Sequence, residues 1–260
     1  MKPELTVKYF LSAGDCNAQG ELSLPRLTAN IIETATAHAN SLNIGNPVMK
    51  HLGYGWILSR IGIEMDRYPK VNEEYSVTTW IESFNRHFSI RNFKISDSEG
   101  KPIGYSISVW MVMNWNTREN AGTSHLNLDA SLISGISTPM SRLGKHRAII
   151  QPGETAHNNP LIATEAPIFN TFRYSDLDFY RHVNTVRYVE MLLDCFSLEQ
   201  MDESQVRRIE LAFMREGRYG ESVKLLRVDE DFHTSFALSD AEDGTALLSA
   251  SLLRRPRTFS

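Results

Sequence analysis

One short segment of the sequence gathers side chains that could act together in catalysis. Nine residues hold two carboxylates, an imidazole and an amide, at Asp176, Asp178, His182 and Asn184. A carboxylate and an imidazole so close together supply general acid and base groups near neutral pH. Zinc sites usually draw on more His or Cys than this segment offers, and hard cations on several convergent carboxylates. The pattern favours acid–base chemistry, and we expect neither a metal nor a cofactor.

This segment ends where a helix is predicted to begin. Asn184 is a suitable N-cap for a helix from Thr185 to about Phe196, in which apolar residues recur at steps of three and four. N–H groups of a first helical turn lack intrahelical partners, and the helix dipole favours negative charge there. Main-chain donors at this turn could stabilise an oxyanion, an effect of about 10²–10³ in rate per donor. Carboxylates before a helix are as often capping groups, and we expect a structural role for Asp176.

The chain repeats a set of features. The stretches S-D-S-E-G at 96–100 and S-D-A-E-D-G at 239–244 are both turns between strand-like runs, with glycines 144 positions apart (244 − 100). Upstream, Ile63 and Ile209 each open an Ile-Glu strand, 146 positions apart (209 − 63). A solenoid would repeat at about 20–50 residues. Several matches at nearly one offset predict two copies of one small domain.

Each copy has the same predicted order of a short strand, one long helix and a run of strands. The helix of the first copy is predicted from Leu27 to about Leu42. This order is typical of α+β proteins with antiparallel sheets. We predict an N-terminal subdomain over 1–140, a linker over 141–165 and a C-terminal subdomain over 166–260, because residues 135–165 are rich in turn formers. The predicted strands are 56–66, 75–82, 88–95, 103–115, 206–215, 221–228, 232–238 and 245–254.

Composition excludes several classes of protein. With 42% hydrophobic and 22% charged residues in 260, the chain is neither disordered nor collagen-like. A net charge of −4 gives no global attraction to nucleic acid or to an anionic membrane, and no long apolar run predicts membrane insertion. Two cysteines, Cys16 and Cys195, are too few for a disulfide framework. We therefore expect a cytoplasmic protein that binds no nucleic acid.

Three stretches resemble motifs of the fatty acyl–acyl carrier protein (ACP) thioesterases of plants and bacteria. They are R-Y-S-D-L-D-F-Y-R-H-V-N-T-V-R-Y-V-E at 173–190, I-L-S-R-I-G-I-E-M-D-R-Y-P-K at 57–70 and S-I-S-V-W-M-V-M-N-W-N-T-R-E at 106–119. The resemblance runs from about residue 5 to 253. It implies a double hot-dog fold, in which each half wraps a curled antiparallel sheet around its long helix. The implied reaction is hydrolysis of fatty acyl-ACP, which releases free fatty acid and ends chain elongation.

The same resemblance assigns the site. It places the family's catalytic Asp at Asp178, its His at His182 and a Glu, within R-E-G-R, at Glu216. Two positions depart from plant members: Tyr180 replaces an Asn, and Gly217 replaces a Cys, so that no cysteine nucleophile can act there. The residues leave open whether Glu216 or Asp178 activates a water, or whether Asp178 attacks the carbonyl to form an anhydride.

The first copy shows no carboxylate or imidazole at Pro25–Ile31, where its helix is expected to start. We therefore predict one active site per chain, with the first half supplying an acyl pocket lined by Trp56, Leu58 and Trp110. The carrier protein is acidic, so its docking surface should be basic. Candidates are Arg142, Lys145, His146, Arg147, Arg207, Arg208, Arg215 and Arg218.

Three alternatives stay open because fold does not fix chemistry. A thioesterase or a hydratase acting on acyl-coenzyme A could use the same fold. The substitution at Tyr180 also motivates a non-catalytic module that binds or senses acyl groups. A homodimer stays open too, since the duplication could replace the pairing that single-copy relatives obtain by dimerising.

Overall fold

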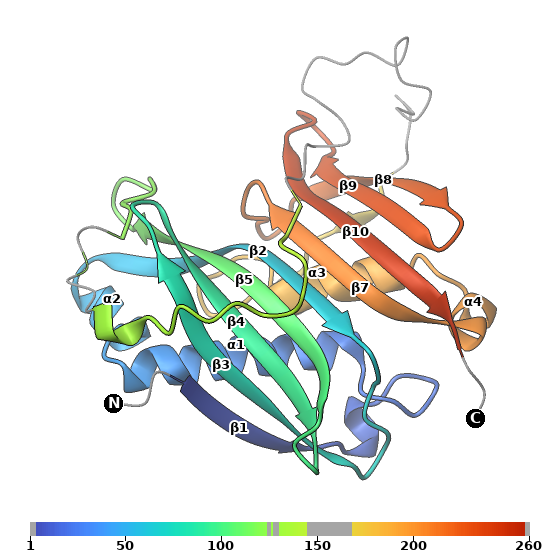
Figure 1. Ribbon diagram of the computed structural model, residues 1–260. Coiled ribbons are helices and arrows are strands. Elements are labelled where there is room, and N and C mark those ends of the chain that lie inside the picture. The colour runs from blue at the N-terminus through green and yellow to red at the C-terminus, as the bar shows by residue number, and fades with distance from the viewer. Residues whose placement is uncertain (1–3, 124–125, 127–129, 145–167, 258–260) are drawn as a thin grey trace. The chain divides into compact units, whose positions relative to one another are not determined.

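The computed structural model describes residues 4–123, 126, 130–144 and 168–257. The chain divides into two compact units, Met1–Leu143 and Gly144–Ser260. Each contains a long helix and an antiparallel sheet, as Figure 1 shows. Most of the predicted linker, 141–165, lies outside the described residues. The predicted α+β class is confirmed.

Five antiparallel strands form the sheet of the first unit, in the order β1-β3-β4-β5-β2. Helix α1 follows β1, and a short helix α2 precedes β2. The bounds are β1 Glu4–Phe10, α1 Leu24–Ser41, α2 Asn46–His51, β2 Tyr54–Met65, β3 Glu74–Phe84, β4 Phe88–Asp97 and β5 Pro102–Asn114, with 3₁₀ helices at Ala13–Asp15 and Ala130–Leu132.

Helix α1 begins three residues before the predicted Leu27. Ser23 caps it by accepting from the Arg26 N–H (3.4 Å), and a proline occupies the first turn, where a missing N–H costs no helical bond. Leu27 and Ile31 are fully buried on the side that contacts β3 and β1. This apolar stripe holds α1 along one face of the sheet (Figure 1).

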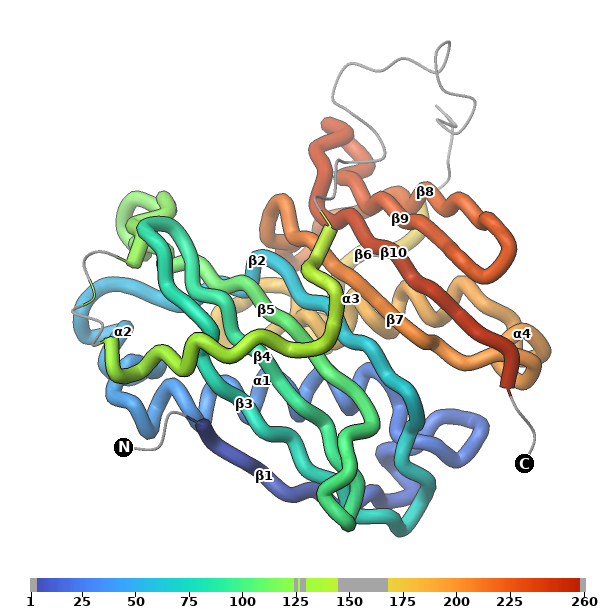
Figure 2. Tube along the Cα trace, viewed as in Figure 1, coloured from blue at the N-terminus to red at the C-terminus, as the bar shows by residue number. Residues whose placement is uncertain are grey.

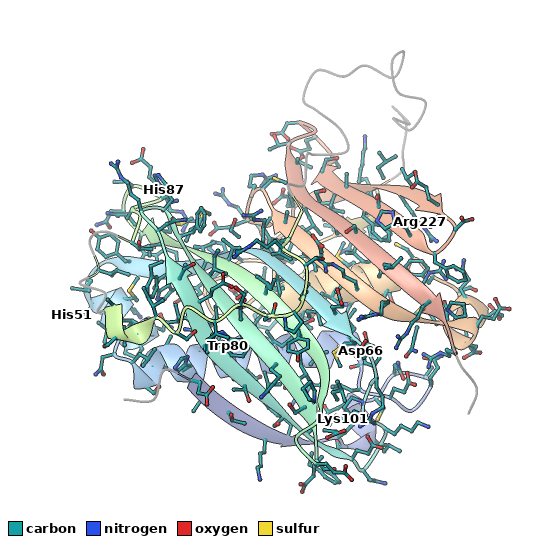
Figure 3. All side chains as sticks on the ribbon, viewed as in Figure 1. His51, Asp66, Trp80, His87, Lys101 and Arg227 are labelled. Carbon is teal, nitrogen blue, oxygen red and sulfur yellow. The ribbon has the colours of Figure 1, made fainter. Side chains whose placement is uncertain are left out.

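The other face of the first sheet is covered by residues 130–143, drawn yellow-green across β3, β4 and β5 in Figure 2. Trp80, labelled in Figure 3, donates from Nε1 to the Ile136 carbonyl (2.7 Å). Arg142 forms an ion pair with Glu82 (2.8 Å). Residues 135–143, assigned to a turn-rich connection by composition, thus pack on the first unit.

The second unit repeats this plan with shorter elements. Its strand order is β7-β10-β9-β8-β6, all antiparallel, and α3 precedes β7. The bounds are β6 Asn170–Thr171, α3 Thr185–Leu193, α4 Leu198–Glu203, β7 Ser204–Phe213, β8 Ser222–Glu230, β9 His233–Asp240 and β10 Ala246–Pro256, with a 3₁₀ helix at Tyr174–Asp176. Helix α3 ends three residues before the predicted Phe196.

Both predicted hairpin turns are present. Gly100 and Gly244 adopt positive φ angles of 82° and 73°, between β4 and β5 and between β9 and β10. The predicted long strands all occur, with ends shifted by at most two residues. Helices α2 and α4 were not predicted, because six residues are too few to show a helical period. Among the helices of the described residues, none is long and apolar enough to cross a lipid bilayer.

Candidate active site

The segment before α3 folds into a tight turn closed by the side chain of Asp178. Its Oδ1 accepts hydrogen bonds from the N–H groups of Tyr180 (2.8 Å) and His182 (3.1 Å). The Asp178 N–H in turn donates to the His182 carbonyl (2.8 Å). Such side-chain-to-backbone bonds are typical of Asx turns. Among the described residues, the other carboxylate oxygen, Oδ2, has no hydrogen-bond partner.

The structure brings His182 and Glu216 together, although 34 positions separate them (216 − 182). His182 Nε2 lies 3.2 Å from Glu216 Oε2, and the two side chains are 17% and 19% exposed. The main chains are joined as well, since the Val183 N–H donates to the Gly217 carbonyl (3.0 Å). All three predicted catalytic residues therefore belong to two adjoining loops of the second unit. Both side chains are partly buried and keep some exposed surface.

Asp176 has a structural position, as expected. It is buried; its Oδ1 forms an ion pair with Arg187 Nε (2.8 Å), and its Oδ2 accepts from the Arg173 N–H (2.7 Å). Asn184 caps α3 by accepting from the Val186 N–H (3.0 Å). These two side chains fix the angle at which the Asp178 turn enters the helix.

The expected main-chain oxyanion donors are largely engaged. The N–H groups of Tyr180 and His182 bind Asp178, and that of Val186 binds Asn184. That expectation is wrong for these groups, because the Asx turn and the helix cap use them first. His182, which was also predicted to stabilise charge on a substrate oxygen, stays a candidate for that role.

Tyr180, where the resemblance expected an Asn, contributes its main chain to the turn. Its ring packs on that of Phe179, with ring centroids 3.9 Å apart. Phe179 itself is 76% exposed. The pair of rings lies directly beside the Asx turn in sequence.

Gly217 has a packing reason to lack a side chain. A Cβ there would lie 2.5 Å from the Tyr188 hydroxyl and 2.9 Å from the Phe172 ring. The Tyr188 ring is fixed by edge contacts with Phe172 and Phe213. Burial, and then the charge of Glu221, raise the pKa of Tyr188, so this phenol stays protonated. The site next to Glu216 is closed to a cysteine by the surrounding aromatic packing.

The three predicted pocket residues share one face of the first sheet. Leu58 lies opposite Trp110 in the β2–β5 pairing, and Trp56 is two positions from Leu58. Trp110 donates from Nε1 to Ser108 Oγ (2.7 Å), and Trp56 donates to the Ile44 carbonyl (2.8 Å). Trp56 also packs on the buried cluster that contains Met49.

Several predicted docking cations have partners within their own unit. Arg208 donates to Glu210 (2.7 Å), and Arg215 forms ion pairs with Glu221 and with Asp240. Arg142 pairs with Glu82, as described above, while Lys145, His146 and Arg147 lie outside the described residues. Arg207 is half-buried, and Arg218 is exposed. Sequence reasoning missed Arg173 and Arg181, which are exposed on the Asp178 loop itself.

The same turn occurs a second time, before α1, which corrects the expectation that its counterpart lies at Pro25–Ile31. Asn17 Oδ1 accepts from the N–H groups of Gln19 (3.1 Å) and Glu21 (3.0 Å), as Asp178 does in the second unit. The Leu22 N–H donates to the Pro69 carbonyl (2.8 Å), as Val183 donates to Gly217. The matching pairs are Asp15 and Asp176, Asn17 and Asp178, Gly20 and Arg181, Glu21 and His182, Ser23 and Asn184, Tyr68 and Glu216, and Lys70 and Arg218.

Comparison with known families decides the identity. A model of the acyl-ACP thioesterase N-terminal domain matches residues 4–123, and one of the C-terminal domain matches residues 164–250. The chain belongs to the acyl-ACP thioesterase family. The C-terminal model spans the Asp178 turn and Glu216, and the N-terminal model spans the matching turn that carries Asn17.

Relatives in this family support the assignment. An oleoyl-ACP thioesterase of Coriandrum sativum is 28% identical over 78% of this chain, and a palmitoyl-ACP thioesterase of Gossypium hirsutum is 23% identical over 90%. The chain spans somewhat more than half the length of these two relatives, 58% and 57%. Both relatives are described as chloroplastic.

Solved structures agree on the fold. An acyl-ACP thioesterase from Bacteroides thetaiotaomicron is 27% identical, with a TM-score of 0.83 over 97% of this chain and 98% of its own. A 12:0-ACP thioesterase from Umbellularia californica is 17% identical, with a TM-score of 0.76 over 98% and 96%. The predicted double hot-dog fold of acyl-ACP thioesterases is thereby confirmed.

Proposed function

We propose that this protein hydrolyses the thioester of fatty acyl-ACP and releases a free fatty acid. The observation that carries the proposal is the 3.2 Å contact between His182 and Glu216, next to the Asp178 turn. It supplies paired acid and base groups beside a carboxylate, which is what thioester hydrolysis requires. Membership of the acyl-ACP thioesterase family gives the substrate class.

The two oxygens of Asp178 have separate roles in this proposal. Oδ1 is held by two N–H groups and maintains the turn, which leaves Oδ2 for the reacting centre. Glu216 and His182 handle protons, because their side chains already face one another. A water oxygen forms a bond to the thioester carbon and gives its proton to a carboxylate. The C–S bond breaks, the departing thiolate takes a proton from His182, and the proton held by the carboxylate replaces it on the imidazole.

Two routes use Asp178 differently, and label found in Asp178 would identify the anhydride route. If Oδ2 attacks the carbonyl carbon, an anhydride forms and water then cleaves it. A single turnover in ¹⁸O-water would then place label in the carboxylate of Asp178 whenever water attacks the aspartyl carbon. Mass spectrometry of the peptide that carries Asp178 detects this label. With Asp178 or Glu216 acting as a base, all of the label appears in the fatty acid.

The first unit supplies the acyl pocket in this proposal. Trp56, Leu58 and Trp110 share one face of its sheet and are only partly buried, which leaves apolar surface for an acyl chain. Replacing Leu58 with Phe should shift the released fatty acids toward shorter chains without changing the pH dependence of kcat. An unchanged chain-length profile would remove these residues from the pocket.

A thiol-release assay tests the proposed reaction against its alternatives. Fatty acyl-ACP should release thiol faster than the same acyl group on coenzyme A. Faster release from coenzyme A identifies an acyl-CoA thioesterase, and consumption of an enoyl thioester without thiol release identifies a hydratase. Tight binding with no reaction identifies a sensing module. Cytoplasmic location and a homodimer stay predictions, which fractionation and light scattering would test.

A further inference from the structure

Six exposed side chains lie on the two loops that carry His182 and Glu216. Tyr174, Phe179 and Tyr219 are 87%, 76% and 69% exposed, which is unusual for large aromatic residues. Three arginines accompany them. The six residues, named the rim below, are Arg173, Tyr174, Phe179, Arg181, Arg218 and Tyr219. Main-chain bonds place these loops side by side: Gly220 N–H donates to the Phe172 carbonyl, and His182 bridges to Arg218.

The matching turn of the first unit shows that the fold does not require these side chains. Its backbone bonds are the same, yet most of the corresponding residues are small. The counterparts of the rim, in the same order, are Ser12, Ala13, Ala18, Gly20, Lys70 and Val71. Large exposed aromatic groups lower solubility, and among the three only Phe179 has a described ring partner, Tyr180. The backbone of the turn therefore does not explain why these large side chains occur in only one of the two turns.

The backbone conformation of Arg181 is the one that glycine adopts in the first unit. Its φ angle is +68°, in the left-handed region, where Gly20 of the first unit has +72°. A side chain other than glycine costs about 1–2 kcal/mol in this conformation. Arg181 therefore holds a strained backbone conformation at the tip of the Asp178 turn, where the first unit has a glycine.

Charges on these loops are segregated. Two carboxylates on these loops pair with arginines, Asp176 with Arg187 and Glu221 with Arg215, and Glu216 contacts His182. In the described part of the chain, no ion pair involves the guanidinium groups of the rim arginines. The rim thus presents positive charge although the whole chain carries −4.

We propose that the rim is the surface on which the acyl carrier protein docks. This inference rests on the proposed function, because the partner must bring its thioester to the His182–Glu216 pair. The carrier protein is acidic, so the rim arginines complement its charge and speed its encounter. Aromatic residues and arginine are enriched in protein interfaces, where they contribute much of the binding energy. The rim replaces the docking surface expected at Arg208 and Arg215, whose charges are already paired.

The double variant R173S/R181G tests the rim with substitutions that the first unit already contains. Because Ser12 and Gly20 occupy these places in an intact turn, the Asp178 turn should keep its geometry. We expect kcat/KM for acyl-ACP at low ionic strength to fall at least 10-fold and its salt dependence to flatten. Hydrolysis of the same acyl group on uncharged pantetheine should change less than twofold. The control K8S/K70S removes two exposed charges from the first unit and should leave both substrates unaffected.

A second variant, Y174A/F179A, tests the aromatic part of the rim. It should lower kcat/KM for acyl-ACP at high and low salt alike. Equal losses on acyl-ACP and acyl-pantetheine would overturn the proposal, because the variants would then be disturbing catalysis. Unchanged activity of R173S/R181G on acyl-ACP would overturn it as well. If the wild type hydrolyses neither substrate, the proposed function fails. The rim is then still tested by titrating the wild type and R173S/R181G with the carrier protein and comparing their affinities.

Discussion

Asn17 and Asp178 occupy the same place in two turns, one in each unit, that have the same pattern of backbone hydrogen bonds. Each side chain accepts two main-chain N–H groups through Oδ1, and each turn leads into a capped helix. Asp15 and Asp176 also correspond, and each pairs with an arginine in the first turns of the following helix, at 3.2 and 2.8 Å. What both turns share is what the fold needs. An amide closes the same turn as a carboxylate does, so the turn itself does not require the charge of Asp178.

In each unit, the loop that pairs with this turn also carries an arginine that pairs with two carboxylates. Arg67 pairs with Glu73 and Asp97 in the first unit, as Arg215 pairs with Glu221 and Asp240 in the second. The differences lie elsewhere: Glu21 replaces His182, and Tyr68 replaces Glu216. Together with Asn17 in place of Asp178, these make three substitutions between the proposed catalytic turn and its counterpart in the first unit.

The largest expected effect comes from making the two turns alike at this position. Asp178→Asn should lower kcat at least 10³-fold, because Oδ2 is replaced by an amide group that can neither attack nor accept a proton. The melting temperature should stay within about 2 °C, since Asn17 closes the same turn. Steady-state kinetics with acyl-ACP and a thermal melt measure both quantities.

The matched control is Asn17→Asp, which adds a carboxylate to the first unit. It should leave kcat unchanged, because Glu21 and Tyr68 provide no imidazole–carboxylate pair. An Asp178→Asn enzyme that retains wild-type kcat would mean that this carboxylate is structural in both units.

Glu216→Gln should have the next largest effect. The amide keeps a contact with His182 but cannot take up a proton, so kcat should fall about 10²-fold, within the range for loss of a general base. KM should change little, because the substitution removes no binding surface. If KM rises while kcat is kept, Glu216 binds substrate and has no role in proton transfer.

Two glycines test the packing that differs between the turns. Gly217→Ala should lower the free energy of unfolding by about 1–3 kcal/mol, since its Cβ meets Tyr188, Phe172 and Val183 within 3 Å. Gly20→Ala, in open space at positive φ, should cost about 1 kcal/mol from backbone strain alone. Urea unfolding of both variants measures the difference. Equal costs would mean that the loop around Gly217 relaxes freely.

Much of the fold was predictable because periodicity and turn chemistry are local. Gly100 and Gly244 marked their hairpins, and Asn184 marked the start of α3. The turn of the first unit was not predicted because its counterpart was expected at Pro25–Ile31. These residues belong to α1, whereas the turn lies before them at residues 12–23. The spacing N-x-x-G-E against D-x-x-R-H could have revealed it.

The sequence indicated which residues belong to the candidate site, but it did not indicate which of them contact one another. His182 and Glu216 meet through a main-chain pairing of two loops, which sequence patterns do not report. The same holds for the docking cations: sequence gives the charge of Arg208 and Arg215 but not the carboxylates that neutralise them. Arg218 was among the predicted docking cations, whereas Arg173 and Arg181 were not, because exposure at a turn cannot be read from spacing.

A polar pair found in the first unit alone gives the smallest expected effect. In the last turn of α1, which is longer than α3, His38 Nδ1 lies 2.7 Å from Arg91 Nη1. Burial, and then the charge of Arg91, lower the pKa of His38 from 6.5 to about 4. The corresponding residue in the second unit is Thr234, six positions before Asp240 as Arg91 is before Asp97, so no such pair forms there.

The depressed pKa of His38 makes unfolding of the first unit depend on pH. Between about pH 6.5 and 4 the unfolded chain binds a proton that the folded chain excludes, so stability is full above this range and falls as pH falls. Linkage predicts a loss of about 1 kcal/mol between pH 7.5 and 5.5 from this group. In His38→Asn, whose Oδ1 can still accept from Arg91, urea unfolding at the two pH values should show a loss smaller by that amount. An unaltered pH dependence would mean that His38 is protonated in the folded protein as readily as in the unfolded chain.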